Sequence, residues 1–153
     1  MNEIILELPL PPSKNRAPRS HMAHWRWVWT TKRDTWVAAC TEPANVKPFK
    51  EPPRRVRIIG HFKVPYNLRD EGGLQESLKP VVDALKRKHH GGISNKTGKA
   101  YGDQLKWRSG LYLDRGYIID DSPDMVEYGL HTQETVPGKQ YGGLTLTLEV
   151  LEW

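Results

Sequence analysis

The chain has 153 residues, of which 37% are hydrophobic, so it can build one domain with a modest core and has no room for two. Lysine and arginine number 23 against 18 aspartate and glutamate, and the resulting net charge of +5 favours an acidic partner such as nucleic acid. Cys40 is the only cysteine, which excludes an intrachain disulfide and a multi-cysteine zinc site. We therefore expect one domain over residues 1–153 in a reducing, cytoplasmic compartment.

The first twelve residues, MNEIILELPLPP, contain a short apolar run that Glu3, Glu7 and the prolines interrupt. This pattern predicts a strand rather than a signal peptide or a membrane span, and we expect no membrane partner. The proline pair ends the strand and leads into a basic loop, SKNRAPRSH. The loop is either a solvated surface segment or an arm that binds DNA phosphates through Lys14, Asn15, Arg16 and Arg19.

Tryptophans alternate in the next segment, WRWVWTTKRDTWVAAC, at Trp25, Trp27 and Trp29, whereas apolar residues from Trp36 onward recur at helical spacing. We expect this segment to begin extended and to end as a short helix capped near Thr31. The rings favour packing in the core or in a dimer over stacking on bases.

Three further strands are predicted, at RRVRIIGHFKVP, MVEYGLHTQE and GLTLTLEVLEW, because apolar residues alternate along them. An apolar stripe that begins at Leu74 predicts a helix, and its start near Glu76 or Ser77 would place Pro80 in the first turn. Residues 88–110 show no periodicity and predict a long inserted loop. The expected fold class is α/β, with a mixed four-stranded sheet and packed helices.

Two adjacent carboxylates, Asp120 and Asp121, follow a short apolar run and precede a Ser-Pro turn. Neighbouring carboxylates repel each other, so they are tolerated at a solvated turn or where they share a cation. Mg²⁺ takes oxygen ligands and commonly binds through one or two carboxylates. From this pair alone, a strand-capping turn is favoured by about three to one over a metal site.

Four segments, in this order, resemble the RusA-type Holliday-junction resolvases, endodeoxyribonucleases of bacteria and their phages. They are the first strand with LPLPPSKNR, then RDEGGLQESLKPVVDAL, then GYIIDDSPDMV, and a final strand. The resemblance covers most of the chain apart from residues 88–110. It implies a homodimer of small mixed α/β domains that cuts Holliday junctions or other branched DNA with Mg²⁺, or with Mn²⁺ in its place.

The resemblance also implies roles for particular residues. The expected catalytic residues are Asp70, Lys79 and Asp121, with Lys79 near the scissile phosphate. The metal ligands that the resemblance implies are Asp70 and Asp121. We add Asp120 and Glu71 as candidates for a further metal ligand, and Arg69 joins the basic loop in binding DNA. Without the resemblance, Asp70 would be either a turn or helix-cap acid or a ligand, and Lys79 would be interpreted as the partner of Asp83 one helical turn away.

The sequence departs from the family pattern at Gly72 and Gly73, which stand where the family has its second aspartate and an asparagine. The lysine also lies three residues further along than in the short form of the motif. One metal ligand is therefore missing. Glu71, Glu76 or Asp120 would replace it, or a water molecule would, since Mg²⁺ sites often keep several waters.

The sequence thus predicts a Mg²⁺-dependent, structure-specific endonuclease that resolves branched DNA. The alternative is a DNA-junction-binding protein of the same fold whose cleavage is weak or absent because of the missing carboxylate. A third candidate is an RNA-directed or general basic binding module, because net charge does not specify the nucleic acid.

Overall fold

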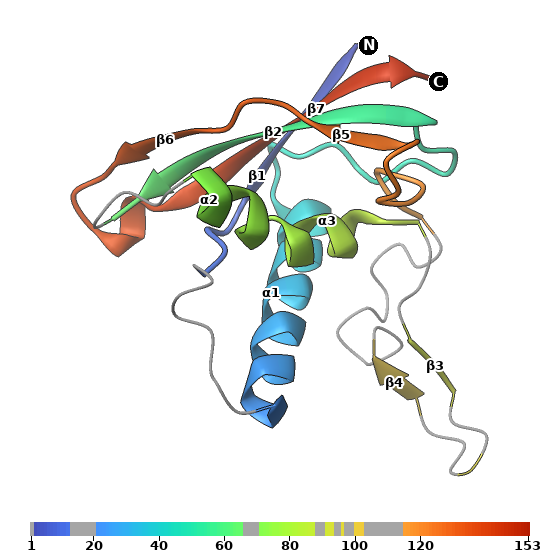
Figure 1. Ribbon diagram of the computed structural model, residues 1–153, viewed down its shortest axis with the longest axis horizontal. Coiled ribbons are helices and arrows are strands. Elements are labelled where there is room, and N and C mark those ends of the chain that lie inside the picture. The colour runs from blue at the N-terminus through green and yellow to red at the C-terminus, as the bar shows by residue number, and fades with distance from the viewer. Residues whose placement is uncertain are drawn as a thin grey trace.

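In the part of the chain that the structure describes, a mixed, open sheet of five strands carries three α-helices on one of its faces (Figure 1). The computed structural model describes residues 2–12, 21–65, 71–87, 91–93, 96, 100–102 and 115–153, and gives the backbone alone for 21–26, 71, 91–93 and 100–102. Within this part of the chain, no helix is both long and apolar enough to cross a membrane.

The long strands of the sheet are paired antiparallel. Strand β1 (Glu3–Leu8) pairs with β7 (Gly143–Glu152), which pairs on its other side with β2 (Arg55–Val64). Two short strands, β5 (Val126–Tyr128) and β6 (Thr132–Thr135), both run parallel to β2. A parallel pair needs a crossover connection, and the chain between β2 and β5 carries two of the helices across the covered face.

The sheet has five strands rather than the predicted four, because the single strand expected over residues 125–134 is divided in two. At the division, the Gly129 N–H donates to the Ile58 carbonyl oxygen over 2.9 Å. The next ladder position is taken by a side chain, since His131 Nδ1 accepts the Gly60 N–H over 3.0 Å. The backbone pairing therefore stops, and β6 begins one residue later.

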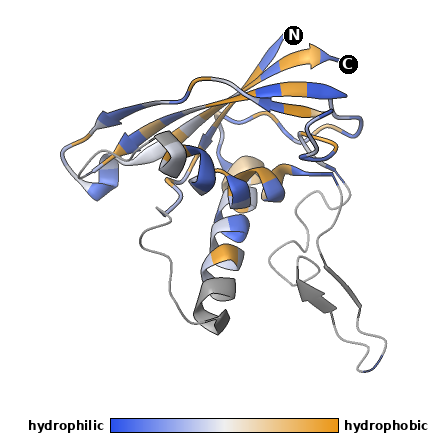
Figure 2. Ribbon diagram, viewed as in Figure 1, coloured by the Kyte–Doolittle hydropathy of each residue, from blue (hydrophilic) through white to orange (hydrophobic). Residues whose placement is uncertain are grey.

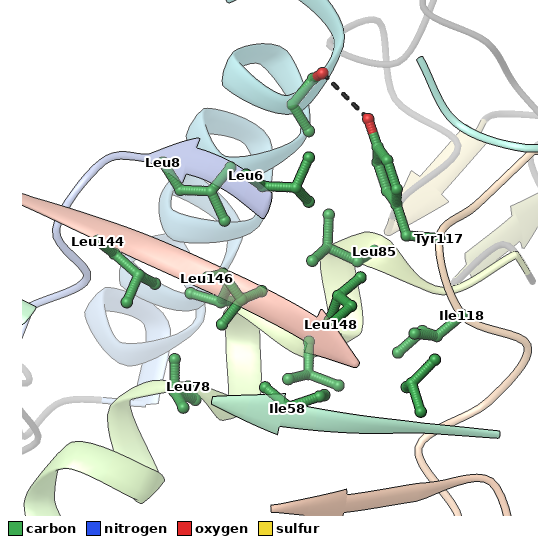
Figure 3. Close-up of a cluster of buried hydrophobic side chains, with 14 of the residues drawn as sticks. Leu6, Leu8, Ile58, Leu78, Leu85, Tyr117, Ile118, Leu144, Leu146 and Leu148 are labelled. Carbon is green, nitrogen blue, oxygen red and sulfur yellow. Dashed lines mark hydrogen bonds between the residues drawn. The ribbon is translucent and has the colours of Figure 1, made fainter. Parts of the chain in front are cut away.

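The core lies between the sheet and the helices. Residues alternate between buried and exposed along β1, β2 and β7, as expected for strands with one covered face, and Figure 2 shows the same alternation in hydropathy. Figure 3 shows Leu146 and Leu148 of β7 gathered in one buried cluster with residues of β2 and of the helical layer: Ile58, Leu78 and Leu85. Full burial of one such side chain contributes about 1.5–3 kcal/mol.

Helix α1 (His21–Thr41) is continuous, so the expectation that its first part is extended is wrong. The alternating tryptophans did not distinguish the two forms, because Trp25 and Trp29 are also one helical turn apart. Trp27 and Trp29 are half-buried, and the side chain of Trp25 lies outside the described part. The buried side chains of α1 form one stripe, which packs on α3 and β1: Thr31, Lys32, Thr35, Trp36 and Ala39.

Two short helices replace the single helix that was predicted after β2. Helix α2 (Glu71–Ser77) contains both glycines, and α3 (Lys79–Leu85) follows after one intervening residue, Leu78. Pro80 lies in the first turn of α3, as predicted, where the missing N–H of proline breaks no helical hydrogen bond. The buried residues of α3 form its apolar face toward the sheet.

The predicted loop over residues 88–110 contains regular structure. Strands β3 (Gly91–Ile93) and β4 (Ala100–Gly102) pair antiparallel into a two-stranded ribbon, which lies apart from the main sheet in Figure 1. The prediction of a loop without secondary structure is therefore wrong for these residues. Near the other end of the chain, a short 3-10 helix, η3 (Lys139–Tyr141), precedes β7.

We expect Tyr117→Phe to lower the free energy of unfolding by about 1–3 kcal/mol, because it removes a buried donor. The Tyr117 side chain is fully buried, and its hydroxyl lies 2.5 Å from the Val46 carbonyl oxygen and 3.1 Å from that of Ala39. Urea unfolding measures the change. Tyr141→Phe is the control, since Tyr141 is 57% exposed, and equal effects of the two variants would contradict this role of the hydroxyl.

Candidate active site

The end of α3 is joined by hydrogen bonds to the segment that leads to the paired aspartates. The Tyr117 N–H donates to the Leu85 carbonyl over 2.9 Å, and the Arg87 N–H donates to the Ile118 carbonyl over 2.8 Å. Gly116 permits this close approach, because a Cβ at that position would lie 2.5 Å from the Arg87 nitrogen. The segment therefore runs directly beside the end of α3 and brings Asp120 and Asp121 next to it.

The paired aspartates stand at the start of a turn that leads into β5. The Ser122 carbonyl accepts hydrogen bonds from the N–H groups of Met125, over 2.9 Å, and Val126, over 3.0 Å. Asp120 Oδ1 accepts the Asp121 N–H over 2.8 Å. The Asp-Ser-Pro segment thus forms a turn that leads into β5, and both carboxylates remain partly exposed on it.

Three carboxylates gather around one ammonium group. Lys86 Nζ lies 2.8 Å from Asp83 Oδ1, 3.0 Å from Asp121 Oδ1 and 3.8 Å from Asp120 Oδ1. The Lys86 side chain is 10% exposed, against 30% for Asp83, 39% for Asp120 and 45% for Asp121. We call Asp83, Asp120 and Asp121 the acidic cluster. Its members come from α3 and from the turn before β5, and a nearly buried cation lies at its base.

Two further groups border the acidic cluster. Lys32 of α1 places its Nζ 3.9 Å from Asp83 Oδ2. Tyr128 of β5 is half-buried, and its pKa is raised by burial and by the negative charges of Asp121 and Asp83. Burial and these charges therefore disfavour loss of the Tyr128 hydroxyl proton.

The carboxylate partners of Lys86 keep its ammonium protonated. Burial alone would lower its pKa, but the hydrogen bonds and charges of Asp83 and Asp121 outweigh burial, so the pKa of Lys86 is raised above 10.5. Lys86 is thus a permanent cation at physiological pH, fixed between the helix and the turn.

The structure brings together some of the predicted site residues. Asp120 and Asp121 lie in the acidic cluster, whereas Lys79 is exposed at the first residue of α3. Asp83, considered from sequence only as a partner for Lys79, is paired with Lys86 and Lys32. Several predicted residues lie outside the described part, which also leaves out the Glu71 side chain: Lys14, Asn15, Arg16, Arg19, Arg69 and Asp70.

Sequence reasoning did not assign Lys86 or Tyr128 to the site. The spacing of Asp83 and Lys86 was a usable signal, because residues three apart on a helix are neighbours. No local pattern marks Tyr128, since its relation to the acidic cluster arises from the pairing of β5 with β2. In the described part of the chain, no group of three or more Asp, Glu, His or Cys side chains is spaced to hold a metal ion by itself.

A small hollow of about 100 Å³ lies elsewhere, lined by Leu74, Gln75, Gly129, Leu130 and His131. It contains no member of the acidic cluster and is smaller than ligand pockets, which span about 300–1,000 Å³. His131 packs edge-on against the rings of Phe62 and Tyr128. Its Nδ1 accepts the Gly60 N–H, so the proton of the neutral ring lies on Nε2, which is buried without a hydrogen-bond partner among the described residues. The acidic cluster is therefore the stronger candidate site.

Comparison of the sequence with family models and with curated proteins finds no match. The function must therefore be argued from the acidic cluster and from the sequence motifs.

We expect the protein to lose stability as pH falls through the histidine range, in part through His131. Burial lowers the pKa of His131 below 6.5. The neutral ring therefore contributes to the free energy of unfolding above pH 6.5. This contribution is lost as the pH falls, because the unfolded chain binds a proton that the folded chain resists. His131→Asn offers Gly60 a non-titrating acceptor. The free energy of unfolding of this variant should vary less between about pH 7 and pH 5. His61→Asn is the control, and an equal change in slope for both variants would contradict the assignment.

Proposed function

We propose that the protein is a Mg²⁺-dependent, structure-specific endonuclease of the RusA type, acting on branched DNA as a homodimer. The observation that carries the proposal is the acidic cluster, in which the aspartates of the Asp-Asp turn stand beside α3, the helix that begins with Lys79. These are two of the motifs that produce the resemblance, and they are distant in sequence. The proposal therefore draws on sequence pattern and on three-dimensional arrangement.

The donor chemistry of the acidic cluster fits a hard divalent cation. Asp120 and Asp121 offer carboxylate oxygens on an exposed turn, and Mg²⁺ commonly binds through one or two carboxylates together with waters and substrate phosphate. These two residues would hold the ion, with Asp70 as the further ligand that the motif implies. A bound Mg²⁺ would activate a water molecule and polarise a phosphoryl oxygen.

The other residues act through charge. The ammonium of Lys79, exposed at the start of α3, would stabilise the negative charge that develops on the phosphoryl oxygens during attack. Lys86 lies beneath the carboxylates and keeps Asp83 and Asp121 together despite their like charges. The basic residues Lys14, Arg16, Arg19 and Arg69 would bind the phosphates that flank the scissile bond.

A non-cleaving junction-binding protein is the second candidate. Gly72 and Gly73 lie within α2, so the place of the family's second aspartate carries no side-chain ligand. Three carboxylates that surround an ammonium also have less charge left to attract a metal ion. Under this alternative the protein binds junctions but stays inert with Mg²⁺ and with Mn²⁺.

We expect Asp121→Asn to reduce the rate of junction cleavage by about a hundredfold or more while junction binding is retained. The amide removes an anionic ligand but keeps an oxygen that can accept the Lys86 hydrogen bond, so the fold should survive. Single-turnover cleavage of a labelled four-way junction measures the rate, and a gel-shift assay measures binding.

Asp124→Asn is the matched control for Asp121→Asn, because Asp124 is an exposed acid in the same turn but outside the acidic cluster. It should cleave at the wild-type rate. Full activity of Asp121→Asn would remove Asp121 from the site. If the wild type is inert at every Mg²⁺ and Mn²⁺ concentration, the nuclease proposal is rejected in favour of the junction-binding protein.

We expect tighter binding to a four-way junction than to a linear duplex of equal length, with two chains bound per junction. The affinity should fall steeply with salt, because each neutralised phosphate contributes about −0.9 to the slope of log K against log salt. Fluorescence anisotropy at several salt concentrations measures both quantities. Equal affinity for the two DNA shapes would contradict junction recognition, and a flat salt dependence would contradict nucleic-acid binding.

A further inference from the structure

Lys86 combines deep burial with two short contacts to carboxylates from different elements. Its side chain is 10% exposed, and its Nζ contacts Asp83 Oδ1 of α3 over 2.8 Å and Asp121 Oδ1 of the turn over 3.0 Å. Lys32 is equally buried, with a side chain that is also 10% exposed, but its Nζ lies 3.9 Å from Asp83 Oδ2. Lys86 therefore bridges the helix and the turn.

The position of the Lys86 ammonium is fixed from both ends of the residue. On the backbone side, Leu85 and Arg87 are hydrogen-bonded to Tyr117 and Ile118, so the chain at Lys86 cannot shift without breaking this pairing. At the other end, the ammonium is held by two carboxylates. A cation in such a place cannot swing into solvent as a surface lysine does, and it is a constant part of the electrostatic field of the acidic cluster.

We propose that Lys86 is a positioning residue that serves as the resident cation of the acidic cluster. Its ammonium ties Asp121 to Asp83, and it competes with a divalent cation for the Oδ1 atoms of these two residues. This inference rests on the proposed function, since it concerns how the acidic cluster admits the Mg²⁺ that the nuclease would use. It goes beyond that function by assigning to Lys86 the control of metal affinity.

The competition follows from charge and from space. A metal ion that binds both Oδ1 atoms would have to displace the Lys86 ammonium, whereas an ion bound elsewhere on the same carboxylates would be repelled by it. Either way, Lys86 lowers divalent-cation affinity. Without metal, the same ammonium offsets the mutual repulsion of Asp83, Asp120 and Asp121 and so stabilises the turn.

The test compares Mn²⁺ binding to the metal-free full chain, without DNA, for wild type, Lys86→Met and Lys32→Met, by isothermal titration calorimetry. Methionine keeps much of the length of the buried stem and removes the charge. Lys86→Met should bind Mn²⁺ about tenfold more tightly, because a unit charge close to a divalent ion has been removed. Lys32→Met should change the affinity less, because Lys32 Nζ lies 3.9 Å from Asp83 and is the control for loss of an equally buried lysine.

Thermal melting adds a second readout. In the presence of a chelator, Lys86→Met should melt at a lower temperature than wild type, and Mn²⁺ should raise its melting temperature more than that of wild type. Adding Asp121→Asn to Lys86→Met should abolish the gain in Mn²⁺ affinity. Unchanged or weaker Mn²⁺ binding by Lys86→Met would overturn the proposal, as would a gain that persists in the double variant.

An NMR experiment on the wild type covers the case in which Lys86→Met does not fold. In protein labelled with ¹⁵N-lysine, the Lys86 ammonium signal is identified by its absence in Lys86→Arg. Saturation with Mg²⁺ should shift or broaden this signal, because the ion competes for the oxygens that hold the ammonium. An unchanged Lys86 signal with Mg²⁺ bound would overturn the proposal. If Lys86→Met does not fold, failure of the wild type to bind any divalent cation would overturn it as well.

The same measurements separate this inference from the proposed function. If Lys86→Met binds Mn²⁺ more tightly but the wild type never cleaves DNA, the role of Lys86 as resident cation is supported and the nuclease is rejected. Metal-dependent cleavage by a wild type whose Mn²⁺ affinity is unaffected by Lys86→Met would support the nuclease and reject the resident cation.

Discussion

The backbone hydrogen bonds between the end of α3 and residues 116–118 are the contact on which the candidate site depends. They join a helix that packs beneath the sheet to a segment that leads into β5. The same segment places the Tyr117 hydroxyl against the carbonyls of Ala39 and Val46, which fixes it to the end of α1 and the loop beyond. These backbone hydrogen bonds bring Asp83 and Asp121 within reach of the same lysine, Lys86.

Charge inside the acidic cluster differs in kind from charge on the uncovered face of the sheet. On that face, Arg57 lies 2.9 Å from Glu149 across two strands, and both side chains are more than a third exposed. Such exposed pairs contribute roughly 0–1 kcal/mol, since water competes with each partner. The Lys86 side chain is nearly buried, so its carboxylate partners stabilise its charge. The ammonium in turn offsets the repulsion between those carboxylates.

The proposed nuclease must therefore use a site that already contains a positive charge. A buried ammonium fixes the carboxylates in place before any metal ion arrives, which favours precise geometry. It also weakens the attraction for that ion. The two glycines in α2 act in the same direction, because they leave one expected carboxylate out of the site. Weak metal affinity is thus the expected property that connects the proposed nuclease with its non-cleaving alternative.

Several parts of the fold could be predicted from local pattern. The buried faces of β1, β2 and β7 follow their alternating apolar residues, and Pro80 was correctly expected in the first turn of a helix. Other parts could not. A pattern of three alternating tryptophans is too short to distinguish a strand from a helix. Packing of one stripe of α1 on α3 and β1 stabilises the helix.

The sequence by itself determined which residues face the core, where carboxylates stand in pairs, and how much positive charge the chain carries, because each of these depends on spacing or composition. Only the tertiary structure decided that Asp83, Asp121 and Lys86 meet. Asp121 follows Lys86 by a long stretch of chain, and their 3.0 Å contact exists because residues 116–118 return to the end of α3. Local periodicity carries no information about such a return, which depends on the packing of the helices against the sheet.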